Sequence, residues 1–323
     1  MKRIDVHAHL FPSEYLKQLK ALGGSAGPVF ISELGGGDSP EEIEARLKTM
    51  DRAGVDKEIL SVSYAVPATT DESKAIAAAQ CVNDAYAELV RRYPDRFAAF
   101  ATMPLPFVDA AVGEIGRALD KLGMAGIATT TEIAGKPLAD PAFADFFAEL
   151  DRREAVLFIH PSGSSVHSAA IADFTWSIGA PFEDMLCLLQ LVKADIPRRY
   201  PHIKIISAHL GGCAPFLAER LAHHDVLPAS WAPQRPALTR EEARWFYYDT
   251  VNGHPPALRC ACETFGADRL LMGTDIPFNR GDGHQLMVEH IANSGLSAAD
   301  VSAIYGGNAL RIFGNRLLAL SGA

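Results

Sequence analysis

Eight short segments with the character of β-strands alternate with longer helical stretches along this chain of 323 residues. Several of these segments are nearly continuous apolar runs, which is typical of parallel strands covered on both faces. Eight strands alternating with helices predict a (β/α)8 barrel of the TIM type, with a doubly wound open sheet as the competing fold. The predicted strands are residues 3–10, 57–63, 97–105, 126–131, 155–161, 203–210, 246–251 and 269–275.

The segments between the strands carry helix and loop signals. Residues 141–153 begin with a proline, which suits the first turn of a helix. Residues 33–40 and 163–181 predict long loops, and long loops in a compact domain are usually functional or disordered. Residues 295–314 predict two closing helices separated by glycines, so the whole chain, residues 1–323, is expected to form one barrel domain. Amphipathic helices are further predicted at residues 73–93 and 108–122.

The overall composition disfavours several classes of function. The net charge is -9 and no block of lysine and arginine occurs, so a nucleic-acid or anionic-membrane partner is not expected. There is no run of about 18 apolar residues, so no membrane span is expected either. The five cysteines are scattered and odd in number, which predicts a reduced, cytoplasmic protein without a disulfide framework.

Two histidines lie two residues apart in the first predicted strand, RIDVHAHL. Side chains at positions i and i+2 of a strand point to the same face, so His7 and His9 should project together. Val6 and Ala8 should then face the opposite side, and Asp5 should share the His7 face one layer deeper. By itself the pair is a weak signal, because a satisfied core histidine is common.

Three other predicted strands end in a polar residue: His160, His209 and Asp275 each follow an apolar run and precede a proline or glycine turn signal. The carboxyl ends of the strands form the catalytic face of a (β/α)8 barrel. Four histidines and one carboxylate would therefore converge there, and such ligands suit a catalytic zinc or similar divalent ion. The alternative is five unrelated buried polar residues, each of which costs energy without a partner.

Four motifs around these residues resemble a known group of enzymes: DVHAH at 5–9, FIHP at 158–161, AHLGG at 208–212 and GTDIPF at 273–278. Together they are similar to the amidohydrolase superfamily. Within it they resemble the decarboxylase branch, which is typified by aminocarboxymuconate semialdehyde decarboxylase and the aromatic-acid decarboxylases. Residues 174–183 further resemble bacterial proteins similar to 6-methylsalicylate decarboxylase. The resemblance spans nearly the whole chain.

The resemblance implies a metal centre at the barrel mouth. His7, His9 and His160 would be metal ligands, Asp275 would be the fourth ligand or lie against the metal water, and His209 would be the neighbouring acid or base. The fourth predicted strand lacks the lysine that is carboxylated in many binuclear amidohydrolases, which favours a single ion. Zinc is expected first because most ligands are imidazoles, and manganese is plausible with the carboxylate.

The resemblance also implies a substrate site. Arg220 would bind the substrate carboxylate, in its own subunit or in that of a homodimer partner, and Phe278 and Trp176 would pack on the substrate. The semialdehyde decarboxylase has an arginine in its first long loop, whereas here residues 10–45 contain none and Arg46 falls on a predicted helix. A monocarboxylate such as a hydroxybenzoate therefore suits this chain better than a dicarboxylate.

The expected activity is the metal-dependent, non-oxidative decarboxylation of a small aromatic or unsaturated carboxylic acid such as an o-hydroxybenzoate. His209 or Asp275 would protonate the ring carbon that carries the carboxylate. A metal-dependent hydrolase of a lactone or amide is an alternative on the same scaffold, because the same ligands activate water. A hydratase is another, and a non-catalytic protein with a structural metal is the alternative from a different class.

Overall fold

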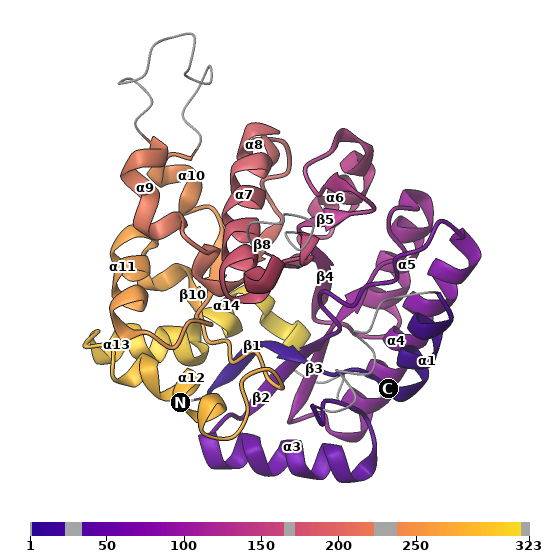
Figure 1. The fold of residues 1–323 in the computed structure, drawn as a ribbon, viewed down its shortest axis with the longest axis horizontal. Helices are drawn as coiled ribbons and strands as arrows, with labels where there is room; N and C mark the ends of the chain where they lie inside the picture. The colour runs from indigo at the N-terminus through magenta and orange to yellow at the C-terminus, as the bar shows by residue number, and fades with distance from the viewer. Residues whose placement is uncertain (1, 23–33, 165–171, 223–237, 318–323) are drawn as a thin grey trace.

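The computed structural model describes residues 2–22, 34–164, 172–222 and 238–317. Eight parallel strands form the centre of the molecule and helices surround them (Figure 1). All eight predicted strands are present, and each is shorter than predicted. Their bounds are β1 (Ile4–His9), β2 (Lys57–Ser61), β3 (Phe97–Thr102), β4 (Gly126–Thr130), β7 (Val156–His160), β8 (Lys204–Ser207), β9 (Tyr247–Asp249) and β10 (Leu270–Leu271).

The last strand returns to the first and closes a barrel. Neighbouring strands pair in the order β1-β2-β3-β4-β7-β8-β9-β10. Beyond β10 the chain continues alongside β1, where the His9 amide donates to the Ile276 carbonyl at 2.7 Å and the Asp275 amide donates to the His7 carbonyl at 2.8 Å. A parallel bridge joins Ala8 and Ile276 at the same place. The (β/α)8 barrel is therefore confirmed and the open doubly wound sheet is wrong.

Helices cover the outside of the barrel, and local signals explain where α3 begins and ends. α3 (Pro40–Ala53) starts with a capping box from Ser39, and Gly54, which has a left-handed backbone, caps its end. The remaining α-helices of the described residues are α1 (Ser13–Ala21), α4 (Glu72–Arg92), α5 (Val108–Asp120), α6 (Ala144–Arg152), α7 (Ala180–Lys193), α8 (Ile196–Arg199), α9 (Ala214–Ala222), α10 (Arg240–Ala243), α11 (Pro255–Phe265), α12 (Asp282–Ala292), α13 (Ala298–Ser302) and α14 (Asn308–Phe313). A short antiparallel hairpin follows β4, and its strands β5 (Glu132–Ile133) and β6 (Lys136–Pro137) have two residues each.

Two predictions about connecting segments need correction. The predicted loop at 163–181 is helical from residue 172 onward: a 3₁₀ turn and the π-helical turn Thr175–Gly179 run directly into α7. Pro181, in the first turn of α7, is the start signal that the loop reading missed. Residues 165–171 lie outside the described residues.

The predicted closing helices are joined, not separated by glycines. α13, the π-helical turn Ala303–Gly307 and α14 form one helical run. A Cβ atom at Gly306 would lie 2.2 Å from the Lys2 carbonyl oxygen, so glycine permits this run to pack against the start of β1. Gly306 therefore serves close packing at the amino-terminal end of the barrel.

Two apolar clusters divide the core. The inner one collects side chains from seven strands and from α14, including Val6, Phe100, Phe158 and Phe313. The outer one lies between the barrel and the helices and includes Ala8. Val6 thus faces the barrel interior, contrary to the prediction from strand alternation.

Among the described residues, no helix combines the length and apolar character needed to cross a membrane.

A bulge in β1 explains the error. Asp5 pairs in register with Glu58 and Ala8 pairs with Leu60, so three steps along β1 match two steps along β2. The extra residue turns Val6 and His7 toward the same side. Asp5 then faces the helical shell, and the prediction that it shares the His7 face is wrong, whereas His7 and His9 both point to the barrel mouth as predicted.

Candidate metal centre and active site

Four side chains that were predicted as metal ligands converge at the carboxyl ends of the strands. His7 Nε2 lies 3.0 Å from His9 Nε2, and Asp275 Oδ1 lies 3.0 Å from His9 Nε2 and 3.3 Å from His7 Nε2. The His160 ring lies 5.1 Å from the rings of both other histidines, measured between centroids. One potential ligand atom from each of the four lies within 4.8 Å of the others. We call these four residues the metal cluster.

The protonation states of three members suit a bound cation. Burial lowers the pKa of His9 to about 4 and holds the pKa of His160 well below its usual value. Burial alone would raise the pKa of Asp275, but the neighbouring His7 and His9 hold it well below its usual range. At neutral pH these groups are therefore two neutral imidazoles and one carboxylate, which are ligand forms.

The raised pKa of His7 shows that the metal cluster favours a positive charge. Burial lowers the pKa of His7, but Asp249 and Asp275 outweigh it and raise that pKa to about 10. His7 Nδ1 lies 2.7 Å from Asp249 Oδ2, which directs Nε2 toward the cluster. The field of two carboxylates therefore favours a positive charge at this position. Three imidazoles, one carboxylate and this field fit a divalent ion such as Zn²⁺ or Mn²⁺.

His209 lies beside the metal cluster and is held by two buried carboxylates. Its Nδ1 lies 2.9 Å from Asp184 Oδ2, and its backbone amide donates to Asp249 Oδ1 at 3.0 Å. Its ring is 5.2 Å from that of His7, measured between centroids. Burial lowers the pKa of His209, yet the negative Asp184 outweighs it and raises that pKa, so the imidazole can hold a proton near the cluster.

Sequence reasoning missed Asp249 and Asp184. Asp249 ends the seventh strand in FYYDTV, and the pattern that singled out Asp275, a polar residue after an apolar strand, applies to it equally. Asp184 directly follows Glu183, which ends the first turn of α7, and both are buried. Two adjacent acidic residues on the inner side of a helix start are the signal that could have indicated it.

Glu183 fixes the segment that follows His160. Its Oε2 accepts hydrogen bonds from the amides of Ser162 at 2.9 Å and Gly163 at 3.0 Å, and from the Thr131 hydroxyl at 3.3 Å. Adjacent residues of one helical turn thus hold two sides of the site, because Glu183 holds the segment after β7 and Asp184 holds His209 after β8. The position of α7 therefore sets the distance between these two segments.

Aromatic side chains stand above the metal cluster. The Phe278 ring lies 5.4 Å from that of His9, measured between centroids. Trp176 lies 5.0 Å from Tyr64, and Tyr64 lies 5.9 Å from Phe278. The two aromatic residues predicted for substrate contact are therefore brought together by Tyr64, which sequence reasoning missed. Tyr64 has a left-handed backbone (φ 61°), a strained conformation for a bulky residue.

Arg220 is not brought to the metal cluster by any contact among the described residues. It lies on the exposed side of α9, one helical turn beyond the exposed Phe216. Its predicted role in the site of its own subunit therefore has no support from the described contacts.

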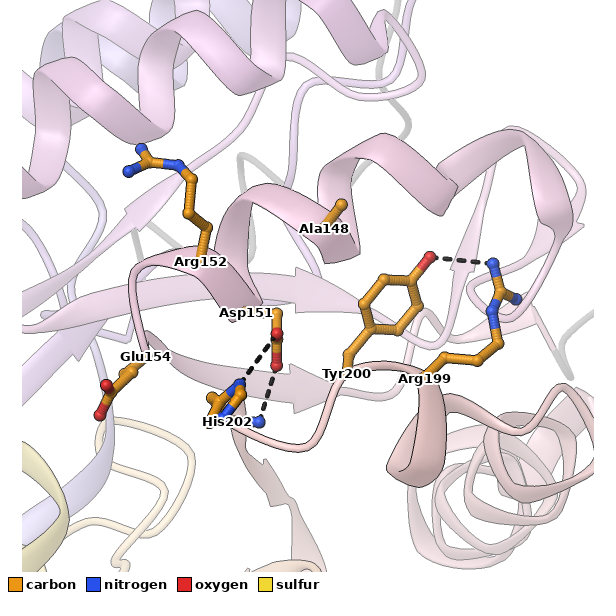
Figure 2. A pocket seen from close by; sticks show the side chains of 7 residues that line it. All are labelled: Ala148, Asp151, Arg152, Glu154, Arg199, Tyr200 and His202. Carbon is orange, nitrogen blue, oxygen red and sulfur yellow. Dashed lines mark hydrogen bonds and ion pairs between the residues drawn. The ribbon is translucent and has the colours of Figure 1, made fainter.

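A surface pocket of about 530 Å³ lies elsewhere, at the amino-terminal ends of β7 and β8 (Figure 2). Two contacts join residues that line it: the His202 amide and ring contact Asp151, and Arg199 donates to the Tyr200 hydroxyl. The pocket opens at the end of the barrel opposite His160, so it is separate from the metal cluster.

Comparison with known proteins agrees with this geometry. The profile described as Amidohydrolase matches residues 4–315. The chain belongs to the amidohydrolase family. This amidohydrolase is 28% identical to 2-amino-3-carboxymuconate-6-semialdehyde decarboxylase of Dictyostelium discoideum, over 97% of the chain and 91% of that protein. It is 32% identical to 6-methylsalicylic acid decarboxylase of Penicillium expansum, over 86% of the chain and 85% of that protein.

A solved structure shows the same architecture with a ligand and a metal. The dihydroxybenzoic acid decarboxylase of a Polaromonas species, with bound manganese and the inhibitor 2-nitroresorcinol, matches with a TM-score of 0.82 at 25% identity. The match covers 97% of each chain. The family resemblance inferred from the motifs is thereby confirmed.

Proposed function

We propose that this amidohydrolase, with residues 1–323 as one catalytic domain, is a metal-dependent carboxy-lyase. It removes carbon dioxide from a small aromatic carboxylic acid such as an o-hydroxybenzoate. The observation that carries the proposal is a cluster of three imidazoles and one carboxylate beside the His209–Asp184 pair. The relatives, which are named decarboxylases of aromatic or unsaturated acids, support this reaction over the others that such a cluster can perform.

In this proposal His7, His9, His160 and Asp275 hold one divalent ion. When bound, the ion supplies a Lewis acid that orients substrate oxygens and stabilises negative charge. Zn²⁺ suits the three imidazoles, and the manganese of the Polaromonas enzyme makes Mn²⁺ the ion to compare with it. Asp249 fixes the ring of His7 through Nδ1 and so keeps Nε2 available as a ligand.

His209 supplies the proton in this proposal. Asp184 holds Nδ1, which leaves Nε2 free to donate to the ring carbon that bears the carboxylate. The electron pair of the broken carbon–carbon bond then restores the aromatic ring as carbon dioxide leaves. Asp275, the alternative acid, is assigned to the metal because its pKa is held well below its usual range, and such a carboxylate is a poor proton donor.

Tyr64, Trp176 and Phe278 are proposed to hold the substrate ring. Their rings lie between 5.0 and 5.9 Å apart along the series Trp176, Tyr64, Phe278, close to the metal cluster. Aromatic faces and edges at such distances pack favourably against another ring and exclude water. This arrangement favours an aromatic substrate over an aliphatic one.

We further propose that the enzyme is a cytoplasmic homodimer in which Arg220 acts in the partner's site. α7 and α9 both pack on the segment 209–211 and expose Phe182, Leu186 and Phe216, of which Phe216 is 83% exposed. Arg220 follows Phe216 by four residues and so lies on the same side of α9. A second copy covering this apolar surface would receive Arg220 as the cation for its substrate carboxylate.

Mixing two inactive variants tests the role of Arg220. Arg220→Ala keeps its own metal cluster, and Asp275→Asn keeps Arg220, so a heterodimer contains one complete site if Arg220 acts in the partner's site. A co-refolded equimolar mixture is expected to recover about a quarter of the wild-type activity, because half of the random dimers are mixed and each has one working site. No recovery in dimers shown to be mixed by native mass spectrometry contradicts the proposal.

A substrate screen tests the reaction itself. The purified enzyme, loaded with Zn²⁺ or Mn²⁺, is incubated with 2-hydroxybenzoates and separately with aromatic lactones and amides. We expect release of carbon dioxide from the hydroxybenzoates and its loss after metal removal. Hydrolysis of a lactone or amide without carbon dioxide from any acid would instead support the hydrolase alternative, and addition of water to a double bond would support a hydratase.

A further inference from the structure

Asp5 organises the bulge that turns His7 into the barrel. Its Oδ1 accepts a hydrogen bond from the His7 amide at 2.9 Å and another from the Thr274 amide at 3.1 Å. Its Oδ2 accepts the Thr274 hydroxyl at 2.5 Å. A bulge leaves a residue out of the regular ladder of backbone hydrogen bonds. Here the bulge lies between Asp5 and Ala8, and the Asp5 side chain accepts the hydrogen bond of the His7 amide within it. Through its bonds with Thr274, Asp5 also connects the bulge to the residue that precedes Asp275.

Arg46 reaches the same region from α3. Its Nη1 donates to the His9 carbonyl at 2.7 Å, and its Nε donates to Glu58 Oε2 at 2.6 Å. Glu58 is the β2 partner of Asp5 in register. His284 approaches from α12, which packs against α3 beside β1 and β2 (Figure 1). We call Asp5, Arg46, Glu58, Thr274 and His284 the polar cluster.

The polar cluster is not suited to a second metal ion. Asp5, Glu58 and His284 each offer a ligand atom within 4.8 Å of the others. The guanidinium of Arg46, however, already binds Glu58 and places a permanent positive charge beside this group. A divalent cation there would meet that charge at close range in a buried environment.

The polar cluster is also costly as a purely structural feature. All five side chains are buried, and Arg46 Nη2, Glu58 Oε1 and His284 Nε2 have no hydrogen-bond partner among the described residues. Replacing a buried ion pair by apolar side chains often leaves a protein equally or more stable. The hydrogen bonds of the polar cluster nevertheless reach the backbone of His7, of His9 and of the residue before Asp275.

We propose that the polar cluster positions the metal ligands by holding the backbone of β1 and of the segment after β10. Asp5 holds the His7 amide, Arg46 holds the His9 carbonyl, and Thr274 connects Asp5 to Asp275. These residues act through the ligands and do not touch the metal or the substrate. The inference rests on the metal site of the proposed function, but it does not depend on which reaction the enzyme performs.

Substitution of Thr274 is the first test. Thr274→Val removes the hydroxyl donor at nearly constant volume, and Thr274→Ser restores it. We expect Thr274→Val to bind Zn²⁺ and Mn²⁺ about tenfold to a hundredfold more weakly, as is typical for supporting groups of metal ligands. Thr274→Ser should return to within a few-fold of wild type. Affinity is measured by competition with a chelator in the absence of substrate, and wild-type affinity in Thr274→Val would overturn the proposal.

Removal of the buried ion pair is the second test. The double variant Arg46→Met/Glu58→Leu is expected to unfold, without metal, at a temperature close to or above that of wild type, yet to bind metal at least about tenfold more weakly. The matched control is Arg153→Met/Glu149→Gln, an ion pair between α6 and the turn after it, which should leave metal affinity unchanged. Metal affinity equal to that of wild type in the folded double variant would contradict the proposal.

Failure of the proposed function is distinguishable from failure of this inference. If the enzyme releases no carbon dioxide from any acid but Thr274→Val weakens metal binding, the positioning role stands and the reaction assignment falls. If decarboxylation is observed and Thr274→Val binds metal as wild type does, the reaction stands and the positioning role falls. Should the double variant fail to fold, the Thr274 pair alone decides.

Discussion

Asp275→Asn is expected to lower the decarboxylation rate by at least about a thousandfold, more than the tenfold to hundredfold typical of groups that only support a metal ligand. The carboxylate is the only anionic member of the metal cluster, and its Oδ1 lies 3.0 Å from His9 Nε2. Asparagine has nearly the same shape but no charge, so it is a weaker ligand for a divalent ion. Steady-state rates, metal content by mass spectrometry and circular dichroism measure the activity, the bound ion and the fold.

Asp282→Asn is the matched control for this variant. Asp282 is an exposed residue in the first turn of α12, only seven positions along the chain, and the same chemical change there should leave activity and metal content unchanged. Full activity of Asp275→Asn would contradict the assignment of Asp275 to the metal. Full activity of enzyme stripped of metal would contradict the metal-dependent mechanism.

His209→Asn is expected to lower kcat by about 10²- to 10⁴-fold, the range associated with loss of a general acid or base. Metal content should remain that of wild type, because His209 is held by Asp184 and Asp249 and is not a member of the metal cluster. The expected combination is therefore a large loss of turnover with an intact metal site. Loss of metal in parallel with activity would make His209 a ligand instead of the acid.

Asp184 provides a test of how His209 works. If Asp184 acts only by holding Nδ1 of His209, Asp184→Ala should reduce kcat in the wild-type background but cause no further loss in His209→Asn. Such non-additivity is the signature of two residues that act as one unit. Independent, additive losses would show that the buried Asp184 contributes through other contacts, for example through the packing of α7.

Much of the fold followed from pattern alone. All eight strands were predicted, because strands covered on both faces require continuous apolar runs that few other elements show. His160 and Asp275, two members of the metal cluster, were found for a related reason: in parallel strands the carboxyl ends all meet at one face, so polar residues there converge whatever the loops do. The segment 172–181 was misread, because its glycine and proline suggest a loop as readily as a helix start.

The supporting residues were harder to predict. Asp184 is separated from His209 by 25 residues, and only the packing of α7 on the barrel brings the carboxylate to the imidazole. Tyr64 reaches the mouth through a left-handed backbone conformation that no periodicity encodes. Asp249 was within reach of sequence reasoning, since it ends an apolar strand as Asp275 does.

The sequence by itself determined the barrel, the family and the four residues of the metal cluster, because alternation of apolar runs and the position of polar residues at strand ends are local properties. Only the tertiary structure decided which way each residue of β1 faces. At the bulge that turns His7 inward, Asp5 accepts hydrogen bonds from the amide and hydroxyl of Thr274, which lies 269 residues away along the chain. Strand periodicity predicts the face of a residue only while the ladder is regular, and here a distant side chain interrupts it.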